Sequence, residues 1–302
     1  KISVVVSLAF LLGHMKNTPA SKQYTFYVAM SGVGLICLLI LPDNLSTALL
    51  LFSVSVILLI IGNIPIRKIL KVVLPLIGVA ILGYFVAPAF GTSEEENRQG
   101  TEQYDDSRNF LERLPTWRKR IDRFVANIVH EKSPEEYMGI DKNLQPGFAR
   151  IAIARGGFSP KLPGNSFARN FLPEANSDFI YAIIIEELGI FGGLFIIILY
   201  IALLFRCGRL VKKCKKKFPA FLLIGCSLII FLQAMIHILV CVQLMPVTGQ
   251  PLPLVSKGGT SLWITCVYFG IMLSVSRTII PSEIERNKNL ANISESEKNE
   301  QL

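Results

Sequence analysis

Long apolar runs constrain this chain more than any other feature. Six of them reach or approach membrane-spanning length, at residues 24–41, 45–63, 70–90, 179–205, 218–243 and 262–280. A helix needs about 20 apolar residues to cross a hydrocarbon core of roughly 30 Å. The chain is 51% hydrophobic with a mean hydropathy of +0.49, and its charges are clustered between the runs. The sequence therefore predicts an all-α polytopic membrane protein rather than a soluble domain.

A seventh apolar run, ISVVVSLAFLLG at residues 2–13, is too short to span a bilayer. It begins without an initiator Met and without the basic residues, apolar core and small-residue cleavage site of a signal peptide. We interpret it as the remainder of a helix whose start, with earlier helices, is missing from this chain. Counting it, the expectation is about seven transmembrane helices.

The distribution of basic residues predicts the topology. The alternate short loops 14–23, 64–72 and 206–217 carry Lys and Arg, and the last of them, RCGRLVKKCKKK, holds seven basic residues and no acid. The positive-inside rule places such loops in the cytoplasm. Residues 91–177 then form one large extracytoplasmic loop, and the polar tail 281–302 is expected to be cytoplasmic and disordered. The net charge of +9 thus reflects topology, and no nucleic-acid partner is expected.

Cysteine and histidine positions predict neither disulfides nor a zinc site. None of the six cysteines lies in an expected outside loop, which leaves no disulfide framework there. The three histidines, His14, His130 and His237, are far apart and form no zinc-ligand spacing with cysteine.

Three polar motifs stand where apolar runs begin, and the topology puts all three on the outer face. They are PDNLST at 42–47, EANSD at 174–178 and PVTGQPLPLVSKGGTS at 246–261. Helix N-termini carry unpaired N–H groups and a positive dipole end, which suit an anion such as phosphate. The pair Gly258-Gly259, followed by Thr260 and Ser261, would let backbone amides and hydroxyls approach such a group closely.

Each polar feature also has a structural interpretation. Asp178 could be a helix N-cap, and the Gly258-Gly259 pair could be an ordinary turn. Glu186 and Glu187, inside an apolar run, could pair with a buried cation. The apolar residues of 117–128 have helical spacing, which predicts a short amphipathic helix along the outer membrane surface, and its basic residues could hold lipid headgroups. Ionisable residues inside or beside membrane spans are nevertheless functional candidates by default, and here several gather on one face.

The same residues resemble the motifs of the SEDS family (shape, elongation, division and sporulation). LPEANSDFIYAIIIEELGIFGG resembles the family motif LPEAHTDFIFAxxxEELG, and PVTGQPLPLVSKGGTS resembles P-T-G-x-x-LP-x-x-S-Y-G-G-S-S. PGNS at 163–166 resembles G-x-G-N-S, and PDNLSTA resembles QPDLGTA. Order and spacing match over nearly the whole chain. Of the two branches, FtsW and RodA, the chain looks closer to FtsW.

The resemblance implies a ten-helix fold, of which this chain would begin in the fourth helix and residues 1–280 would be the transmembrane domain. Lys1 would then match the lysine of the family's Q-P-A-E-x-x-K motif. Two positions depart from the family pattern: Lys257 stands where the family usually has Tyr, and Asn44 interrupts the QPDLGT motif.

The resemblance also implies an activity at the outer face of the bacterial cytoplasmic membrane. SEDS proteins polymerise lipid II, a disaccharide-pentapeptide on undecaprenyl pyrophosphate, into glycan strands. By motif Asp178 would be the general base. Arg120 would contact the pyrophosphate, with Lys257, the 258–261 turn, Asn165, Ser166 and Lys1 as further contacts. Glu186 and Glu187 would have structural or gating roles. No metal site is expected from the residues, although a divalent cation, Mg²⁺ or Mn²⁺, could assist.

The implied partners are a class B penicillin-binding protein, which is a transpeptidase, and other membrane proteins of the division machinery. Two alternatives remain open. A lipid II flippase would use the same groove and anion site but would need polar residues through the membrane, of which Glu186, Glu187, Gln233 and His237 are the main examples. A non-catalytic scaffold would recruit the transpeptidase without chemistry of its own.

Overall fold

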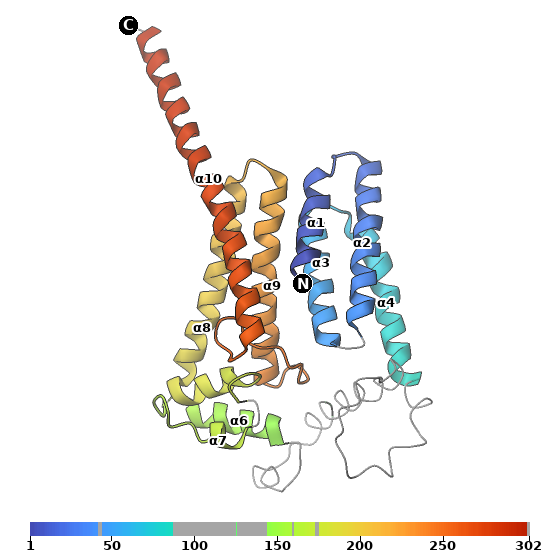
Figure 1. Cartoon of the computed structure of the whole chain (residues 1–302), viewed down its shortest axis with the longest axis vertical. Helices are drawn as coiled ribbons and strands as arrows, with labels where there is room; N and C mark the ends of the chain where they lie inside the picture. The colour runs from blue at the N-terminus through green and yellow to red at the C-terminus, as the bar shows by residue number, and fades with distance from the viewer. Residues whose placement is uncertain (42–43, 87–124, 126–143, 159, 173–174, 301–302) are drawn as a thin grey trace.

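The computed structural model describes residues 1–41, 44–86, 125, 144–158, 160–172 and 175–300. Most of the large loop, including Arg120 and the predicted amphipathic stretch 117–128 apart from Val125, lies outside the described residues. Within them the chain is helical, as Figure 1 shows. The helices are α1 (Ile2–His14), α2 (Pro19–Ile40), α3 (Leu45–Ile61), α4 (Ile66–Val86), α6 (Leu144–Gly156), α7 (Ala168–Phe171), α8 (Ile180–Lys213), α9 (Lys217–Cys241) and α10 (Gly259–Glu300).

The predicted apolar runs fall on α1 to α4 and on α8 to α10. Among the described residues, α2, α8, α9 and the Gly259–Ile279 part of α10 are long and apolar enough to cross a membrane, whereas α1 and α3 are apolar but shorter. These helices support a multi-pass membrane protein. The count of seven spans stays a prediction.

Local signals in the sequence explain where two helices begin. Thr18 precedes Pro19 at the start of α2, and its hydroxyl accepts a hydrogen bond from the backbone N–H of Ser21 at 3.4 Å. Asn44 precedes α3, and its Oδ1 accepts from the N–H of Thr47 at 2.9 Å. A polar cap followed by proline or an apolar run is the usual signature of a helix N-terminus.

Helix α9 is the centre of the bundle. It packs against α1, α3, α8 and α10, and its buried residues include Leu223, Ile229, Ile230 and Ala234. By contrast, α8 exposes a row of large apolar side chains, including Phe191, Phe195 and Phe205. Because such side chains are costly in water, they fit a helix whose outer surface meets lipid.

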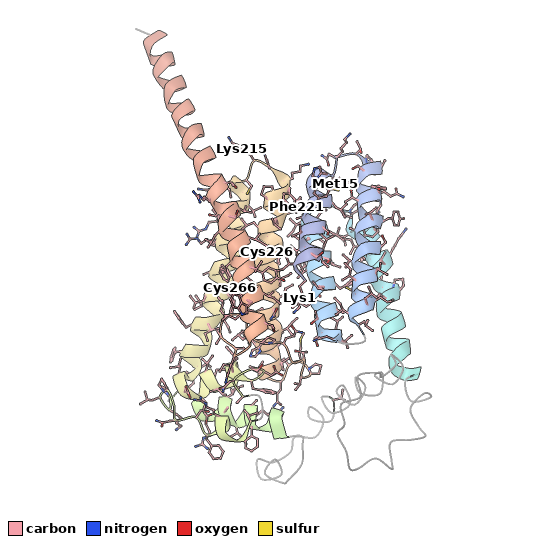
Figure 2. The ribbon with its side chains drawn as sticks, viewed as in Figure 1. Lys1, Met15, Lys215, Phe221, Cys226 and Cys266 are labelled. Atoms are coloured by element: carbon pink, nitrogen blue, oxygen red, sulfur yellow. The ribbon has the colours of Figure 1, made fainter. Side chains whose placement is uncertain are left out.

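The polar motifs gather at one end of the bundle. Figure 1 shows α3, α8 and α10 beginning at the same end, where α6 and α7 also lie. The short connections between α1 and α2 and between α8 and α9 lie at the other end, marked by Met15 and Lys215 in Figure 2. The loop richest in Lys and Arg is therefore opposite the polar motifs, as the charge distribution predicted.

The tail differs from the sequence-based expectation of disorder, because the backbone of α10 continues as helix to Glu300. The residues beyond 281 include many good helix formers, namely Glu, Lys, Ala and Leu. Propagating a helix that the apolar part of α10 has already begun avoids the cost of nucleation.

Two glycines bring α6 close to α8. Gly189 has φ of 72°, which kinks α8, and the N–H of Ile190 donates to the carbonyl of Gly157 at 2.9 Å. A Cβ atom on Gly156 would lie 2.0 Å from the carbonyl oxygen of Ile185. The two helices can therefore meet backbone to backbone only because residue 156 has no side chain.

Gly156→Ala is expected to destabilise the protein by about 3 kcal/mol, the upper end of the usual overpacking range, because backbone rather than a flexible side chain must move. Thermal unfolding in detergent measures the effect. Gly208→Ala is the matched control, since a Cβ there meets nothing within 4 Å. Equal melting temperatures for the two variants would contradict the close packing of α6 on α8.

Candidate functional site

The turn before α8 is fastened to the loop before α10. The N–H of Lys257 donates to the carbonyl of Asn176 at 2.9 Å, and the hydroxyl of Ser256 donates to the carbonyl of Ser177 at 2.7 Å. The Ser256 hydroxyl also accepts from the N–H of Leu252 at 2.7 Å. These bonds bring together two of the three polar motifs, EANSD and PVTGQPLPLVSKGGTS, which lie about 70 residues apart in the sequence.

Asp178 lies in this turn, half-buried, two residues before the start of α8. Phe179, not Asp178, occupies the N-cap position of the helix. The hydroxyl of Ser177 donates to Asp178 Oδ1 at 3.2 Å. On the other side of the carboxylate, a Cβ atom on Gly249 would lie 3.6 Å from Oδ2, and Gly249 has φ of 65°. A glycine in this left-handed conformation lets the loop backbone pass close to the carboxylate.

A polar cavity of about 570 Å³ opens beside this turn. Two cationic residues, Arg169 and Lys257, contribute to its wall, and both are exposed. The remaining lining residues are Leu172, Ala175, Asn176, Ser177, Gly258 and Gly259. A cavity of this size, with positive charge and backbone groups at the start of α10, has the character of an anion-binding site.

Three of the predicted binding residues, Lys257, Gly258 and Gly259, thus line one cavity. Thr260 and Ser261, which follow Gly259 in the first turn of α10, are not among its lining residues. The carbonyl of Ser261 accepts from the Thr265 hydroxyl at 2.7 Å. Arg169 lines the cavity but escaped the sequence analysis; its position between the PGNS and EANSD motifs was the available signal.

Glu186 is fully buried and binds the segment before α7. It accepts hydrogen bonds from the Ser166 hydroxyl at 2.5 Å and from the N–H groups of Phe167 and Ala168 at 3.1 and 3.2 Å. The Arg155 guanidinium forms an ion pair with the same carboxylate, with Nε 3.7 Å from Glu186 Oε1. This carboxylate therefore joins α8 to α6 and α7.

The PGNS segment lies against α8 rather than in the cavity wall. The Ser166 side chain is buried on Glu186, and its oxygen also accepts from the N–H of Arg169 at 3.2 Å. Asn165 is exposed and donates from Nδ2 to the carbonyl of Lys161 at 3.1 Å. The half-buried Glu187 contributes its backbone carbonyl, which accepts from the N–H of Leu162 at 3.0 Å. As arranged here, Ser166 supports the loop that carries Arg169 and does not line the cavity.

Lys1 immediately precedes α1, at the end of the helix opposite to Met15 (Figure 2). Its Nζ donates to Oε1 of Gln250 at 3.2 Å. Gln250 lies next to Gly249, so the loop that passes Asp178 also contacts Lys1.

The polar residues inside α9 are bonded to that same loop. Gln233 donates from Nε2 to the carbonyl of Pro251 at 3.0 Å, and His237 Nδ1 lies 2.8 Å from the carbonyl of Gln250. Both side chains are buried. They satisfy the carbonyls of an irregular loop packed against α9, where a buried and unpaired backbone group would be costly.

No group of three His, Cys, Asp or Glu residues suited to a metal ion occurs in the described part of the chain.

Fold and site together define a polytopic helical membrane protein with an acidic residue and a cationic cavity at one end of its bundle. Residues 1–279 match the model of the cell cycle protein family of FtsW, RodA and SpoVE. The chain belongs to this family, which confirms the resemblance to the SEDS proteins.

Proteins similar to this chain include several that are named FtsW or MrdB. One is a probable peptidoglycan glycosyltransferase FtsW of Hahella chejuensis, 40% identical over 147 residues, which cover 47% of this chain and 37% of the relative. Another FtsW, from Xanthomonas oryzae pv. oryzae, is 28% identical over 294 residues, covering 95% of this chain and 53% of the relative. The peptidoglycan glycosyltransferase MrdB of Escherichia coli K12 is 38% identical over 129 residues, covering 42% and 35%. The chain thus matches about half or less of the length of these relatives.

A solved structure supports the fold. One chain of a peptidoglycan synthase complex matches 91% of this chain and 67% of its own length, with a TM-score of 0.58 and 22% sequence identity.

Proposed function

We propose that the protein is a peptidoglycan glycosyltransferase that polymerises lipid II during cell division. The observation that carries this proposal is the junction of the two polar motifs, which sets the Asp178 turn beside the cavity of Arg169 and Lys257. Membership of the family, and the names of the relatives as peptidoglycan glycosyltransferases, support it.

The substrate and the site have complementary chemistry. Lipid II presents a pyrophosphate between a sugar and a lipid tail, so it needs cationic and N–H groups at the membrane boundary. Arg169, Lys257 and the backbone at Gly258-Gly259 supply such groups on the cavity wall. Arg120, in the WRKRIDRF segment outside the described residues, remains the sequence-based candidate for the same role.

In the proposed reaction, Asp178 accepts the proton of the acceptor sugar hydroxyl as the hydroxyl oxygen attacks the donor anomeric carbon. The new glycosidic bond forms as the bond from that carbon to the pyrophosphate oxygen breaks. The electron pair leaves with undecaprenyl pyrophosphate, whose charge the cationic wall stabilises. Because this leaving group needs no protonation, one carboxylate suffices for an inverting transfer, unlike the pair that glycosidases use.

The charge distribution sets the proposed orientation. With the basic 206–217 loop in the cytoplasm, the Asp178 end faces outward and the C-terminal end of α10 faces inward. The protein would lie in the bacterial cytoplasmic membrane and act with a class B penicillin-binding protein and other membrane proteins of the division machinery. A divalent cation, if one assists, would bind through the substrate pyrophosphate.

The flippase alternative gains no support from the described polar residues. Glu187, one of its four candidates for a path through the membrane, is half-buried. The other three are Glu186, Gln233 and His237. Each is buried and bonded to backbone or side-chain groups of a neighbouring loop. They therefore serve internal contacts rather than line a route between the two faces.

The test uses the protein expressed from its complete gene, purified in detergent and given fluorescent lipid II with and without its transpeptidase partner. Glycan chains on a gel are the expected product. In vesicles, movement of lipid II between leaflets without chain formation would instead support the flippase, and binding of the partner without either activity would support the scaffold.

Lys257→Gln is expected to raise the lipid II concentration needed for half-maximal rate about fivefold, because a single cation in a wet cavity contributes modestly. Steady-state kinetics of chain formation measures it. Lys161→Gln removes an exposed charge from the loop between α6 and α7, outside the cavity wall, and should leave the kinetics unchanged. An equal effect of both variants would point to general surface charge instead.

A further inference from the structure

Gln250 is a buried amide at the meeting point of α1, α3 and α9. Only 4% of its surface is exposed. Its Oε1 accepts from Lys1 Nζ at 3.2 Å, and its Nε2 donates to Thr47 Oγ1 at 2.8 Å and to Asn44 Oδ1 at 3.4 Å. In the motif P-T-G-x-x-LP it occupies the first open position.

The partners fix which way this amide points. Asn44 Oδ1 already accepts from the N–H of Thr47, so it presents an oxygen to Gln250 and requires a donor in return. The ammonium of Lys1 has three donors and no acceptor, so it requires the amide oxygen. With the amide reversed, its NH₂ group would face the Lys1 ammonium and its oxygen would face Asn44 Oδ1. Neither pair could form a hydrogen bond. The network therefore has one satisfactory orientation.

The backbone around Gln250 is also held in place. Its carbonyl lies 2.8 Å from His237 Nδ1, and the next carbonyl, of Pro251, accepts from Gln233 at 3.0 Å. The preceding residue, Gly249, is the one whose backbone passes the Asp178 carboxylate. Hydrogen bonds from α9 therefore hold the loop backbone, and Thr47 of α3 holds the Gln250 amide. The amide in turn orients the flexible Lys1 side chain.

We infer that Gln250 is a positioning residue. It holds the Lys1 ammonium beside the loop in which Gly249 passes near the Asp178 carboxylate, so that the ammonium can bind the anionic part of the substrate. The inference rests on the proposed function for the identity of that substrate. One of the three ammonium donors goes to Gln250, and the other two remain for phosphate oxygens. In the described part of the chain no carboxylate pairs with Lys1.

The same network links two features of the sequence that looked unrelated. Asn44 is where the chain departs from the QPDLGT motif, and Gln250 fills an open position about 200 residues later. Their side chains meet, and Asn44 also caps α3. The departure at Asn44 therefore supplies an acceptor that helps orient Gln250.

A double-mutant cycle tests the inference, using Gln250→Leu, Lys1→Met and the double variant in the protein expressed from its complete gene. Both lipid II affinity and the rate of chain formation are measured. Each single variant is expected to weaken lipid II binding about tenfold, which is the usual size of a charge-assisted hydrogen bond. In the Lys1→Met background, Gln250→Leu should then have no further effect, because the group it positions is gone.

Independent, additive losses would overturn the inference, since they would mean that Gln250 acts on the fold and not through Lys1. An unchanged affinity for Gln250→Leu would overturn it as well. Failure of the wild type to form chains while lipid II still binds would contradict the proposed polymerase but leave the cycle measurable through affinity.

A gentler pair of variants covers the case in which Gln250→Leu does not fold. Thr47→Val removes one acceptor for the Gln250 amide with little change in volume, and is expected to weaken lipid II binding about threefold. Thr25→Val makes the same change at a buried position on α2 outside the network and should leave binding unaltered. Equal effects of the two threonine variants would contradict the positioning role.

Discussion

Asp178→Asn is expected to lower the rate of glycan-chain formation by about 10²–10⁴-fold, the usual contribution of a general base. The amide keeps the size of the side chain and can still accept from the Ser177 hydroxyl, but it has no basic lone pair for the sugar proton. The variant should be inserted and folded like the wild type, because Phe179 rather than Asp178 occupies the N-cap of α8. Chain formation from fluorescent lipid II, followed over time on gels, measures the effect.

Glu187→Gln is the matched control for Asp178→Asn. It makes the same type of change on a half-buried carboxylate nine positions along the chain, whose side chain has no hydrogen bond or ion pair among the described residues. Its rate is expected to stay within about threefold of wild type. A comparable loss in both variants would mean that acidic groups in and just before α8 matter generally and that Asp178 has no special part in the chemistry.

Glu186→Ala is expected to destabilise the protein by about 3 kcal/mol or more. The substitution leaves the Ser166 hydroxyl and the N–H groups of Phe167 and Ala168 without their acceptor in a buried place. It also removes the ion partner of Arg155. Thermal unfolding in detergent should show a clearly lower melting temperature.

Arg155→Gln tests the ion pair of Glu186 separately from the hydrogen bonds that Glu186 accepts. The Arg155 side chain is 46% exposed, so its loss should cost well under 1 kcal/mol. If the arginine variant were as unstable as Glu186→Ala, the ion pair rather than the buried hydrogen bonds would hold α6 and α7 on α8.

Much of the architecture could be predicted because its signals are local and physical. The apolar runs predicted the long helices, and the alternation of basic loops predicted which helix ends lie together. The motif match predicted that the Asp178 turn and the Lys257 loop belong to one site, and the family match confirms the family on which that expectation rested.

The contacts that organise the site could not be read from the sequence, because they join residues that are far apart along the chain. Glu186 lies in an apolar run, and nothing in the neighbouring sequence shows that its carboxylate accepts from Ser166 rather than from a substrate. Gln250 occupies an open motif position, so only the fold reveals that it meets Lys1 and Thr47. Arg169 carried a weak signal, since a lone arginine between two motifs does not show that it faces a cavity.

The most direct test of the central claim is one preparation of wild type and Asp178→Asn in which bound lipid II and glycan chains are measured together. The account predicts that both proteins bind lipid II with affinities within about threefold of each other and that only the wild type forms chains. Chain formation by Asp178→Asn at a near-normal rate would contradict the account, because the carboxylate would then have no part in the reaction.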